Sequence, residues 1–241
     1  MGNGPWEREN CAFGGLKGTK HQFYEDAYRI LSRDVPLVQK QSRGELFGVF
    51  DGIGSARMAR SAAVTMAELL IDFYRKPDLY EASAEGVLRL LYEGNQVIHG
   101  WGLEPGTDRP LGGCVGTVVW LHNMILHTFH AGDTVAALIR DGRITKLTRE
   151  HQTPAGAVFR YFGLGDVLEI ETSRIDLEES DRILIVSDGV VPKAFSLEEA
   201  VLLVEGFLDL KAAVSALIQQ SRARGSQDDI TAILIEAQEW D

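Results

Sequence analysis

The chain has 241 residues, of which 45% are hydrophobic and 24% are charged, and its formal net charge at pH 7 is −11. This length suits one large domain or two small ones, and the composition is ordinary for a globular protein with a sizeable core. Because no basic block offsets the acidic excess, the charge argues against a nucleic-acid backbone or an anionic membrane surface as partner.

The cysteine count and the hydropathy pattern indicate the compartment. Two cysteines, Cys11 and Cys114, do not make a disulfide framework in a chain of this size, so we expect buried, reduced thiols. No apolar run reaches about 18 residues, the length of a membrane-spanning helix. The N-terminus lacks the apolar region of a secretory signal. These features predict a cytoplasmic protein with no membrane segment.

The first half of the chain mixes strand and helix patterns. Ser55 is a suitable helix cap, and the apolar residues after it recur at three- and four-residue spacings, which is typical of an amphipathic helix that ends before Pro77. The predicted elements are strands at 10–16, 24–31 and 45–50, a loop over 32–44, and helices over 56–76 and 79–101.

The second half begins with a run of strands. Asp141–Gly142 is a strong hairpin signal between two of them. Because strands and helices come in blocks and do not alternate strictly, the pattern favours one α+β domain over residues 1–241 with antiparallel sheets. The predicted elements are strands at 115–121, 124–130, 134–140 and 143–147, a loop over 149–166, strands near 167–172 and 182–187, helices at 196–206 and 209–224, and a last strand at 230–236.

An apolar strand that runs directly into a carboxylate occurs three times. Leu46–Gly54 is an apolar run followed by Asp51 and a Gly–Ile–Gly turn, and Arg182–Gly189 ends in Asp–Gly in the same way. Ile125–Asp133 is a looser copy. Three carboxylates delivered by three strand ends could converge on one point, and they would do so stably only around a cation.

The candidate acidic residues all lie at strand edges or turns. A single Asp–Gly pair more often marks only a turn, but several such pairs after buried strands favour a site. Oxygen-only clusters suit Mg²⁺ or Mn²⁺ and not zinc. Two such ions about 3.5–4 Å apart can bridge a hydroxide and hold a phosphoryl oxygen for in-line attack. The candidates are Glu25, Asp26, Asp51, Asp133, Asp188, Asp228 and Asp229.

With these motifs in their order, the sequence resembles the metal-dependent protein serine/threonine phosphatases of the 2C type, in particular the compact bacterial members. The resemblance implies a four-layer αββα sandwich of two mainly antiparallel sheets flanked by helices, with metals in a cleft at one sheet edge. It rests on Tyr24–Ala27, Phe47–Gly52, Gly116–Val119 with Ala131–Thr134, Arg140–Gly142 with Leu147–His151, Ser187–Gly189 and Ser226–Thr231.

The resemblance implies roles for the metal-binding positions. Asp51 would bridge two metals, and the Gly52 carbonyl would complete one coordination sphere. Asp188 and Asp228 look like ligands of the second ion.

Further acids receive roles in the same way. Glu25 and Asp26 look like acids beside the metal pair, and Asp133 corresponds with Asp188 to a third, weaker metal site. Asp229 stands where the family usually has Asn, so Asp228 is preferred as the ligand.

Three departures from the family pattern bear on function. His21, beside Lys20, occupies the position where the family commonly has a phosphate-clamping arginine, and neither residue grips phosphate bidentately. Ile53 stands where other members often have His. The segment Thr148–Phe162 is short where the family usually inserts a flap, which predicts a more open site.

The histidines receive structural interpretations. His127 and His130 are three residues apart on a predicted strand and therefore face opposite sides, so no joint metal site with His122 is expected. His151 is interpreted as a structural turn residue.

The leading hypothesis is a phosphatase that hydrolyses phosphoserine or phosphothreonine with two or three Mn²⁺ or Mg²⁺ ions. A hydroxide that bridges the metals held by Asp51 and Asp188 would attack phosphorus, while Lys20 or His21 neutralises phosphate oxygens. The implied partner is a phosphorylated protein, a target of a Ser/Thr kinase, and we expect a monomer.

Two alternatives remain open from the sequence. Because His21 replaces the arginine, the chain could be a catalytically weak or inactive binding or regulatory module with the same fold. It could also be another metal phosphohydrolase that acts on small phosphate esters. An aspartyl-nucleophile enzyme is disfavoured, because Asp51–Gly52–Ile53 lacks a second Asp two residues on.

Overall fold

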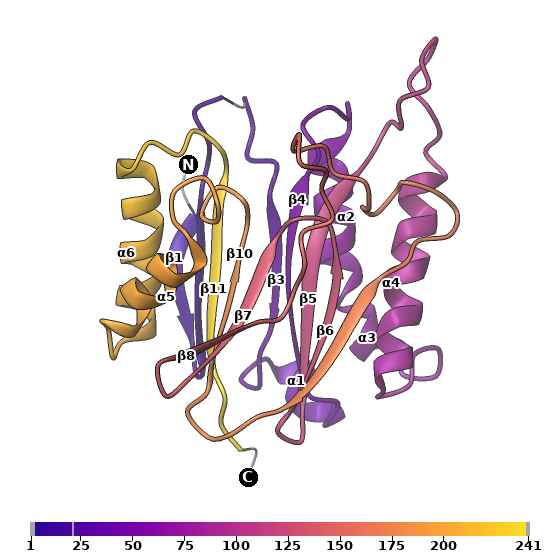
Figure 1. Ribbon diagram of the computed structural model, residues 1–241. Coiled ribbons are helices and arrows are strands. Elements are labelled where there is room, and N and C mark those ends of the chain that lie inside the picture. The colour runs from indigo at the N-terminus through magenta and orange to yellow at the C-terminus, as the bar shows by residue number, and fades with distance from the viewer. Residues whose placement is uncertain (1–2, 21, 240–241) are drawn as a thin grey trace.

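The computed structural model describes residues 3–20 and 22–239, and it shows two facing β-sheets with helices on both outer sides (Figure 1). This is the four-layer αββα sandwich that the sequence predicts, with the antiparallel sheets of an α+β fold. The layers place the central strands between two apolar surfaces, which is why these strands are apolar on both faces.

One sheet has six strands in the order β1-β2-β11-β10-β7-β8, and every neighbouring pair is antiparallel. Its last strand in sequence, β11, lies at the centre, so the C-terminal part of the chain completes the sheet. The strands are β1 (Asn3–Arg8), β2 (Cys11–Leu16), β7 (Val135–Arg140), β8 (Arg143–Lys146), β10 (Arg182–Val186) and β11 (Ile230–Glu236).

The other sheet has five antiparallel strands in the order β3-β4-β5-β6-β9. Helices α2 and α4 cover it, and α5 and α6 cover the six-stranded sheet (Figure 1). The strands are β3 (Ala27–Leu31), β4 (Glu45–Gly52), β5 (Cys114–His122), β6 (Ile125–Ala131) and β9 (Glu171–Asp176). The helices are α1 (Pro36–Gln41), α2 (Ala59–Leu69), α3 (Asp72–Arg75), α4 (Ala84–His99), α5 (Leu197–Glu205) and α6 (Leu210–Ala223).

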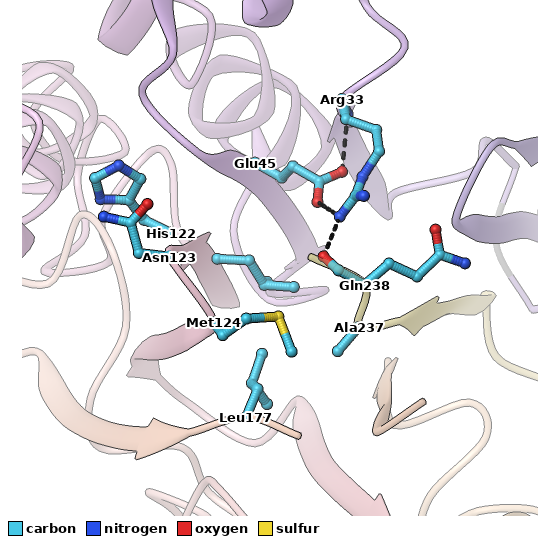
Figure 2. Close-up of a pocket in the computed structure, with 9 residues that line it drawn as sticks. Arg33, Glu45, His122, Asn123, Met124, Leu177, Ala237 and Gln238 are labelled. Atoms are coloured by element: carbon cyan, nitrogen blue, oxygen red, sulfur yellow. Dashed lines mark hydrogen bonds and ion pairs between the residues drawn. The ribbon is translucent and has the colours of Figure 1, made fainter. Parts of the chain in front are cut away.

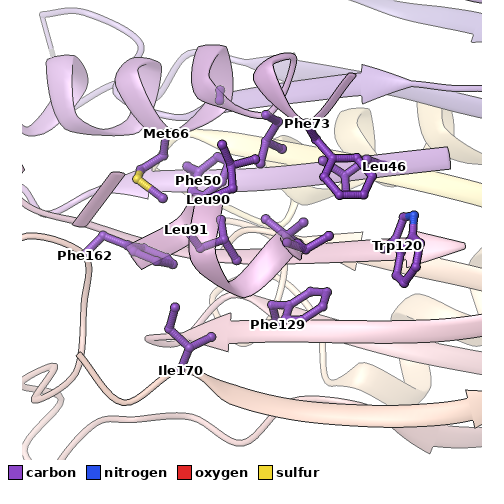
Figure 3. Close-up of a cluster of buried hydrophobic side chains, with 14 of the residues drawn as sticks. Leu46, Phe50, Met66, Phe73, Leu90, Leu91, Trp120, Phe129, Phe162 and Ile170 are labelled. Atoms are coloured by element: carbon purple, nitrogen blue, oxygen red, sulfur yellow. The ribbon is translucent and has the colours of Figure 1, made fainter. Parts of the chain in front are cut away.

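Strand β4 shows how alternation divides the core. Leu46 and Phe50 point toward the helices and pack in the cluster of Figure 3, whereas Phe47 and Val49 point into the space between the sheets. All four are fully buried. At Gly48 a Cβ would lie 2.7 Å from the Leu70 side chain, so the glycine lets the helical layer pack closely on β4.

Several predicted elements differ from the structure. The expected loop over 32–44 contains α1, because Pro36 stands in the first turn, where proline starts a helix. The expected helix over 56–76 is shorter and is divided into α2 and α3. The strand expected near 167–172 begins only at Glu171; Leu168 and Ile170 are buried, but they lie in the preceding loop.

Strand β1 was missed by the sequence analysis, because its residues Asn-Gly-Pro-Trp-Glu-Arg lack strand periodicity. It is an edge strand, where proline is tolerated. The cysteine prediction is confirmed, since Cys11 and Cys114 are both buried free thiols. Over the described ranges, none of the helices has the length and apolar character needed to cross a membrane.

Candidate metal centre

The strand registers bring the predicted acidic residues to one edge of the sandwich. In each sheet, residues that pair directly across neighbouring strands form a row near this edge. The predicted acids lie within four positions of these rows along the chain; they are Asp26, Asp51, Asp133, Asp188 and Asp228. The rows are Ala27, Phe50, Gly116 and Ala131 in one sheet, and Val135, Val186 and Ala232 in the other.

Four of the acids, contributed by both sheets, line a single cavity of about 230 Å³. Residues at the end of β4 and in the segment after residue 149 also line it, together with one lysine. The lining residues are Asp51, Gly52, Ile53, Gly54, Val115, Asp133, Gly156, Val158, Asp188, Lys193 and Asp228.

Two glycines allow the chain segments to meet here. A Cβ on Gly52 would lie 2.7 Å from the carbonyl carbon of Ala59, so the end of β4 touches the start of α2. A Cβ on Gly189 would lie 1.8 Å from the Asp229 carbonyl oxygen. Only glycine fits at such distances, and the second contact holds Asp188 beside the segment that carries Asp228.

Asp26 lies behind Asp51 and not in the cavity wall. It is buried, and Thr231 Oγ1 donates to its Oδ2 at 2.5 Å. Burial, together with the nearby Asp229 and Asp188 charges, raises the pKa of Asp26 to about 7 although the Thr231 hydrogen bond opposes the shift. Burial also raises the pKa of Asp51, and the charges of Asp26, Asp188 and Asp133 raise it further.

The donor set fits a hard divalent cation. Asp26 Oδ1 and Asp188 Oδ1 are buried and have no hydrogen-bond partner. Burial and the Asp188 charge raise the pKa of Asp133 to about 6. Clustered carboxylates with unpaired oxygens are stable as anions when a cation lies among them, and oxygen ligands are those that Mg²⁺ and Mn²⁺ prefer.

The positively charged group beside these acids is the ammonium of Lys193. Its Nζ donates to Asp188 Oδ2 and, at 2.7 Å, to Asp228 Oδ2. With the side chains placed in this way, the described part of the chain contains no ready group of three His, Cys, Asp or Glu ligands around one point. The acids are therefore gathered, but two of them face an ammonium group.

Asp228 and Asp229 have different surroundings. Asp228 lines the cavity, whereas Asp229 is buried and accepts hydrogen bonds from the backbone N–H groups of Gly18 and Glu25, both at 2.5 Å. The two side chains leave the turn before β11 in different directions, one to the cavity and one to the loop between β2 and β3. Asp229 thus anchors the loop between β2 and β3 to the start of β11.

The remaining predicted residues do not join the cavity wall. Glu25 is half-buried and Lys20 is exposed, and neither belongs to the described lining. The backbone N–H of Lys20 donates to the Gln227 carbonyl at 3.3 Å. His21 lies outside the described residues. Lys193 is the cation among the described lining residues, and the expected role of Lys20 toward the phosphate stays a prediction.

The sequence analysis missed Lys193, although a signal for it was present. It follows Asp188 by five residues, and the intervening chain folds into a tight turn in which the Lys193 N–H donates to the Asp188 carbonyl at 3.2 Å. Such a turn returns the lysine to the acid.

Two stacked histidines support the Asp133 turn. Thr117 Oγ1 and His130 Nδ1 lie 2.8 Å apart, and the Gly132 N–H donates to His151 Nδ1 at 3.0 Å. Burial lowers the pKa of His130 to about 4, so the ring is neutral. These contacts give His130 and His151 a structural role, in which they fix the Gly132–Asp133 turn.

A second hollow lies at the opposite end of the sandwich, beside the turn between β5 and β6 (Figure 2). Arg33 Nη2 contacts Glu45 Oε2 at 3.0 Å and donates to the Gln238 carbonyl at 2.7 Å. The hollow holds only about 20 Å³, the space of a single water. It ties the C-terminal segment to the fold and is too small for a substrate.

In EDTA, protein stability is expected to fall as the pH rises from about 6.5 to about 8. Asp26 and Asp51 keep protons in the folded state that the unfolded chain has already lost, so raising the pH favours unfolding. His130 opposes this trend only in the lower part of the range, because burial lowers the folded pKa to about 4 while an unfolded imidazole with an ordinary pKa of 6.5 is still partly charged at pH 6.5. Thermal unfolding at both pH values measures the effect, and a flatter profile in Asp51→Asn is the matched control.

Excess Mn²⁺ should abolish or reverse this pH dependence, because a bound cation favours the ionised carboxylates. A metal-free protein that becomes more stable over this pH range would contradict the proximity of the buried acids.

An αββα sandwich with carboxylates from both sheets at one edge defines a protein of the 2C phosphatase class. A family model described as Stage II sporulation protein E (SpoIIE) matches residues 55–238. The chain belongs to this family, and the resemblance found in the sequence is confirmed.

Sequence relatives agree with this assignment. Probable protein phosphatase 2C 52 of Oryza sativa subsp. japonica is 27% identical over 98% of this chain and 53% of its own length. Probable protein phosphatase 2C 76 of Arabidopsis thaliana is 25% identical over 94% of this chain and 58% of its own length. The chain thus spans somewhat more than half the length of these relatives.

Solved structures share the fold. A bacterial serine phosphatase superposes with a TM-score of 0.81 at 17% identity, covering 96% of this chain and 98% of that one. The catalytic domain of the serine/threonine phosphatase PstP, in complex with two manganese ions, superposes with a TM-score of 0.76 at 19% identity, covering 94% and 96%.

Proposed function

We propose that the chain is a Mn²⁺- or Mg²⁺-dependent phosphatase that hydrolyses phosphoserine and phosphothreonine in proteins. The observation that carries the proposal is the convergence of Asp51, Asp133, Asp188 and Asp228 on one cavity. The family assignment and the two manganese ions of the PstP domain support it. The substrate would be a protein phosphorylated by a Ser/Thr kinase, and the enzyme would act as a monomer.

Each cavity residue has a role in this proposal. Asp51 would be a ligand of both ions. The Gly52 carbonyl would complete the ligand set of one ion, and Asp188 and Asp228 would bind the other. Asp133 would hold a third ion together with Asp188. The bound ions would neutralise phosphoryl oxygens and lower the pKa of a water molecule.

The protein itself contributes orientation and shape. Asp26 is close enough to Asp51 for its charge to raise the pKa of Asp51, and it would support that carboxylate beside the ions, while Glu25 donates its N–H to Asp229. Ile53, Val115 and Val158 form apolar wall segments that limit hydration around the phosphate. Lys20 would approach the phosphate from the loop between β2 and β3, and His21 would share this role.

The test is hydrolysis of a phosphoserine peptide and a phosphothreonine peptide by the purified chain with Mn²⁺, with Mg²⁺ and with EDTA. A phosphotyrosine peptide of the same sequence is the control. We expect release of phosphate from the first two peptides only, and none in EDTA. Tight Mn²⁺ binding without turnover of any peptide would contradict the proposal and identify a binding module.

A further inference from the structure

Lys193 has an unusual position for a lysine, because its ammonium group bridges two acids of the metal centre. It contacts Asp188 Oδ2 and lies 2.7 Å from Asp228 Oδ2, and its side chain is 41% exposed while the two carboxylates are 18% and 20% exposed. The ammonium is thus placed between the two side chains that the proposed function assigns to the second metal ion.

The backbone around Lys193 is fixed by packing. Val190, Val191 and Phe195 are buried against the helical layer over the six-stranded sheet. The N–H groups of Val190 and Lys193 donate to the Ser187 and Asp188 carbonyls, which closes the turn. The Lys193 backbone therefore stays beside Asp188, while its long side chain is free to leave the carboxylates. A cation tethered at this distance has a high effective concentration at the site.

An ammonium group and a divalent ion cannot bind the same two oxygens at once. The hydrogen bonds of Lys193 go to Asp188 and Asp228, whereas its charge acts on Asp133 by lowering the pKa of that carboxyl.

We propose that Lys193 is a built-in competitor for the second metal ion: it occupies the Asp188–Asp228 pair until a divalent ion displaces it. The inference rests on the proposed function for the identity of the ion. It follows that the ion at Asp188 and Asp228 binds more weakly than the carboxylates alone would bind it. If lysine occupied the pair roughly 90% of the time, the apparent affinity would fall about tenfold.

The test is calorimetric titration of the full chain with Mn²⁺, comparing the parent protein with Lys193→Met and Lys193→Arg. Lys193→Met removes the charge and should strengthen the weaker binding step about tenfold, whereas Lys193→Arg keeps the charge and should stay close to the parent. Lys76→Met is the matched control, because Lys76 pairs with Asp72 at 2.8 Å at the C-terminal end of α3, away from the cavity.

Unfolding in EDTA gives a second readout that is independent of metal binding. Without the ammonium, the acids repel one another, so Lys193→Met should melt at a lower temperature than the parent in EDTA. With excess Mn²⁺ this difference should vanish or change sign. Lys76→Met should show no such reversal.

Each outcome separates the inference from the proposed function. Equal or weaker Mn²⁺ binding by Lys193→Met overturns the competitor role alone, whereas no Mn²⁺ binding by either protein overturns the proposed function as well. An unchanged isotherm with peptide hydrolysis intact overturns this inference and leaves the phosphatase standing. Stronger Mn²⁺ binding by Lys193→Met without hydrolysis of any peptide supports this inference and overturns the phosphatase.

Discussion

Asp51→Asn and Asp188→Asn are each expected to reduce Mn²⁺-dependent hydrolysis of a phosphoserine peptide by at least about 100-fold, because loss even of groups that only support metal ligands costs 10–100-fold. Both side chains line the cavity, and Asp188 Oδ1 is buried without a partner. An amide keeps the size of the carboxylate but removes the negative charge that attracts the cation.

The fold of both variants should remain intact in EDTA. Each substitution removes one charge from a crowded acidic cluster, so the metal-free variants should be at least as stable as the parent. Asp108→Asn, an exposed acid in the loop before β5, is the control that should keep full activity. Peptide assays and circular dichroism measure the two effects. Near-parental rates in both variants would show that the metals are held elsewhere.

Asp229→Ala is expected to lose about 2 kcal/mol or more of unfolding free energy, since an unsatisfied buried donor costs about 1–3 kcal/mol. Its carboxylate accepts from Gly18 and Glu25. Asp229→Asn is the informative comparison: it removes the same charge but retains one acceptor oxygen, so it should fall between the parent and Asp229→Ala. Chemical denaturation in EDTA measures all three proteins.

The neighbouring substitution Asp228→Asn should show the reverse pattern. Asp228 is 20% exposed and pairs with Lys193 at the solvent-facing cavity, so its removal should change stability little. It should instead weaken Mn²⁺ binding. If Asp228→Asn were as destabilising as Asp229→Ala, it would contradict the assignment of Asp228 to the cavity and of Asp229 to a structural anchor.

The apolar patterns in the sequence determined most of the elements and the layer arrangement. The strand at 230–236 matches β11, and the strand–carboxylate junctions after β4 and β10 lie where the sequence predicts. Such patterns are local, because a strand buried on both faces must be apolar throughout whatever it pairs with. Elements without this pattern, such as the edge strand β1, could not be found in this way.

Only the tertiary structure decided which acids meet and which cation lies among them. The pairing of β11 with β10 brings Asp228 to Asp188, and its pairing with β2 brings Asp229 to Gly18 across 211 residues of sequence. The direction of a side chain at a strand end depends on register and on the turn that follows. Those depend on contacts between distant segments, so the sequence named the carboxylates while the fold placed Lys193 between two of them.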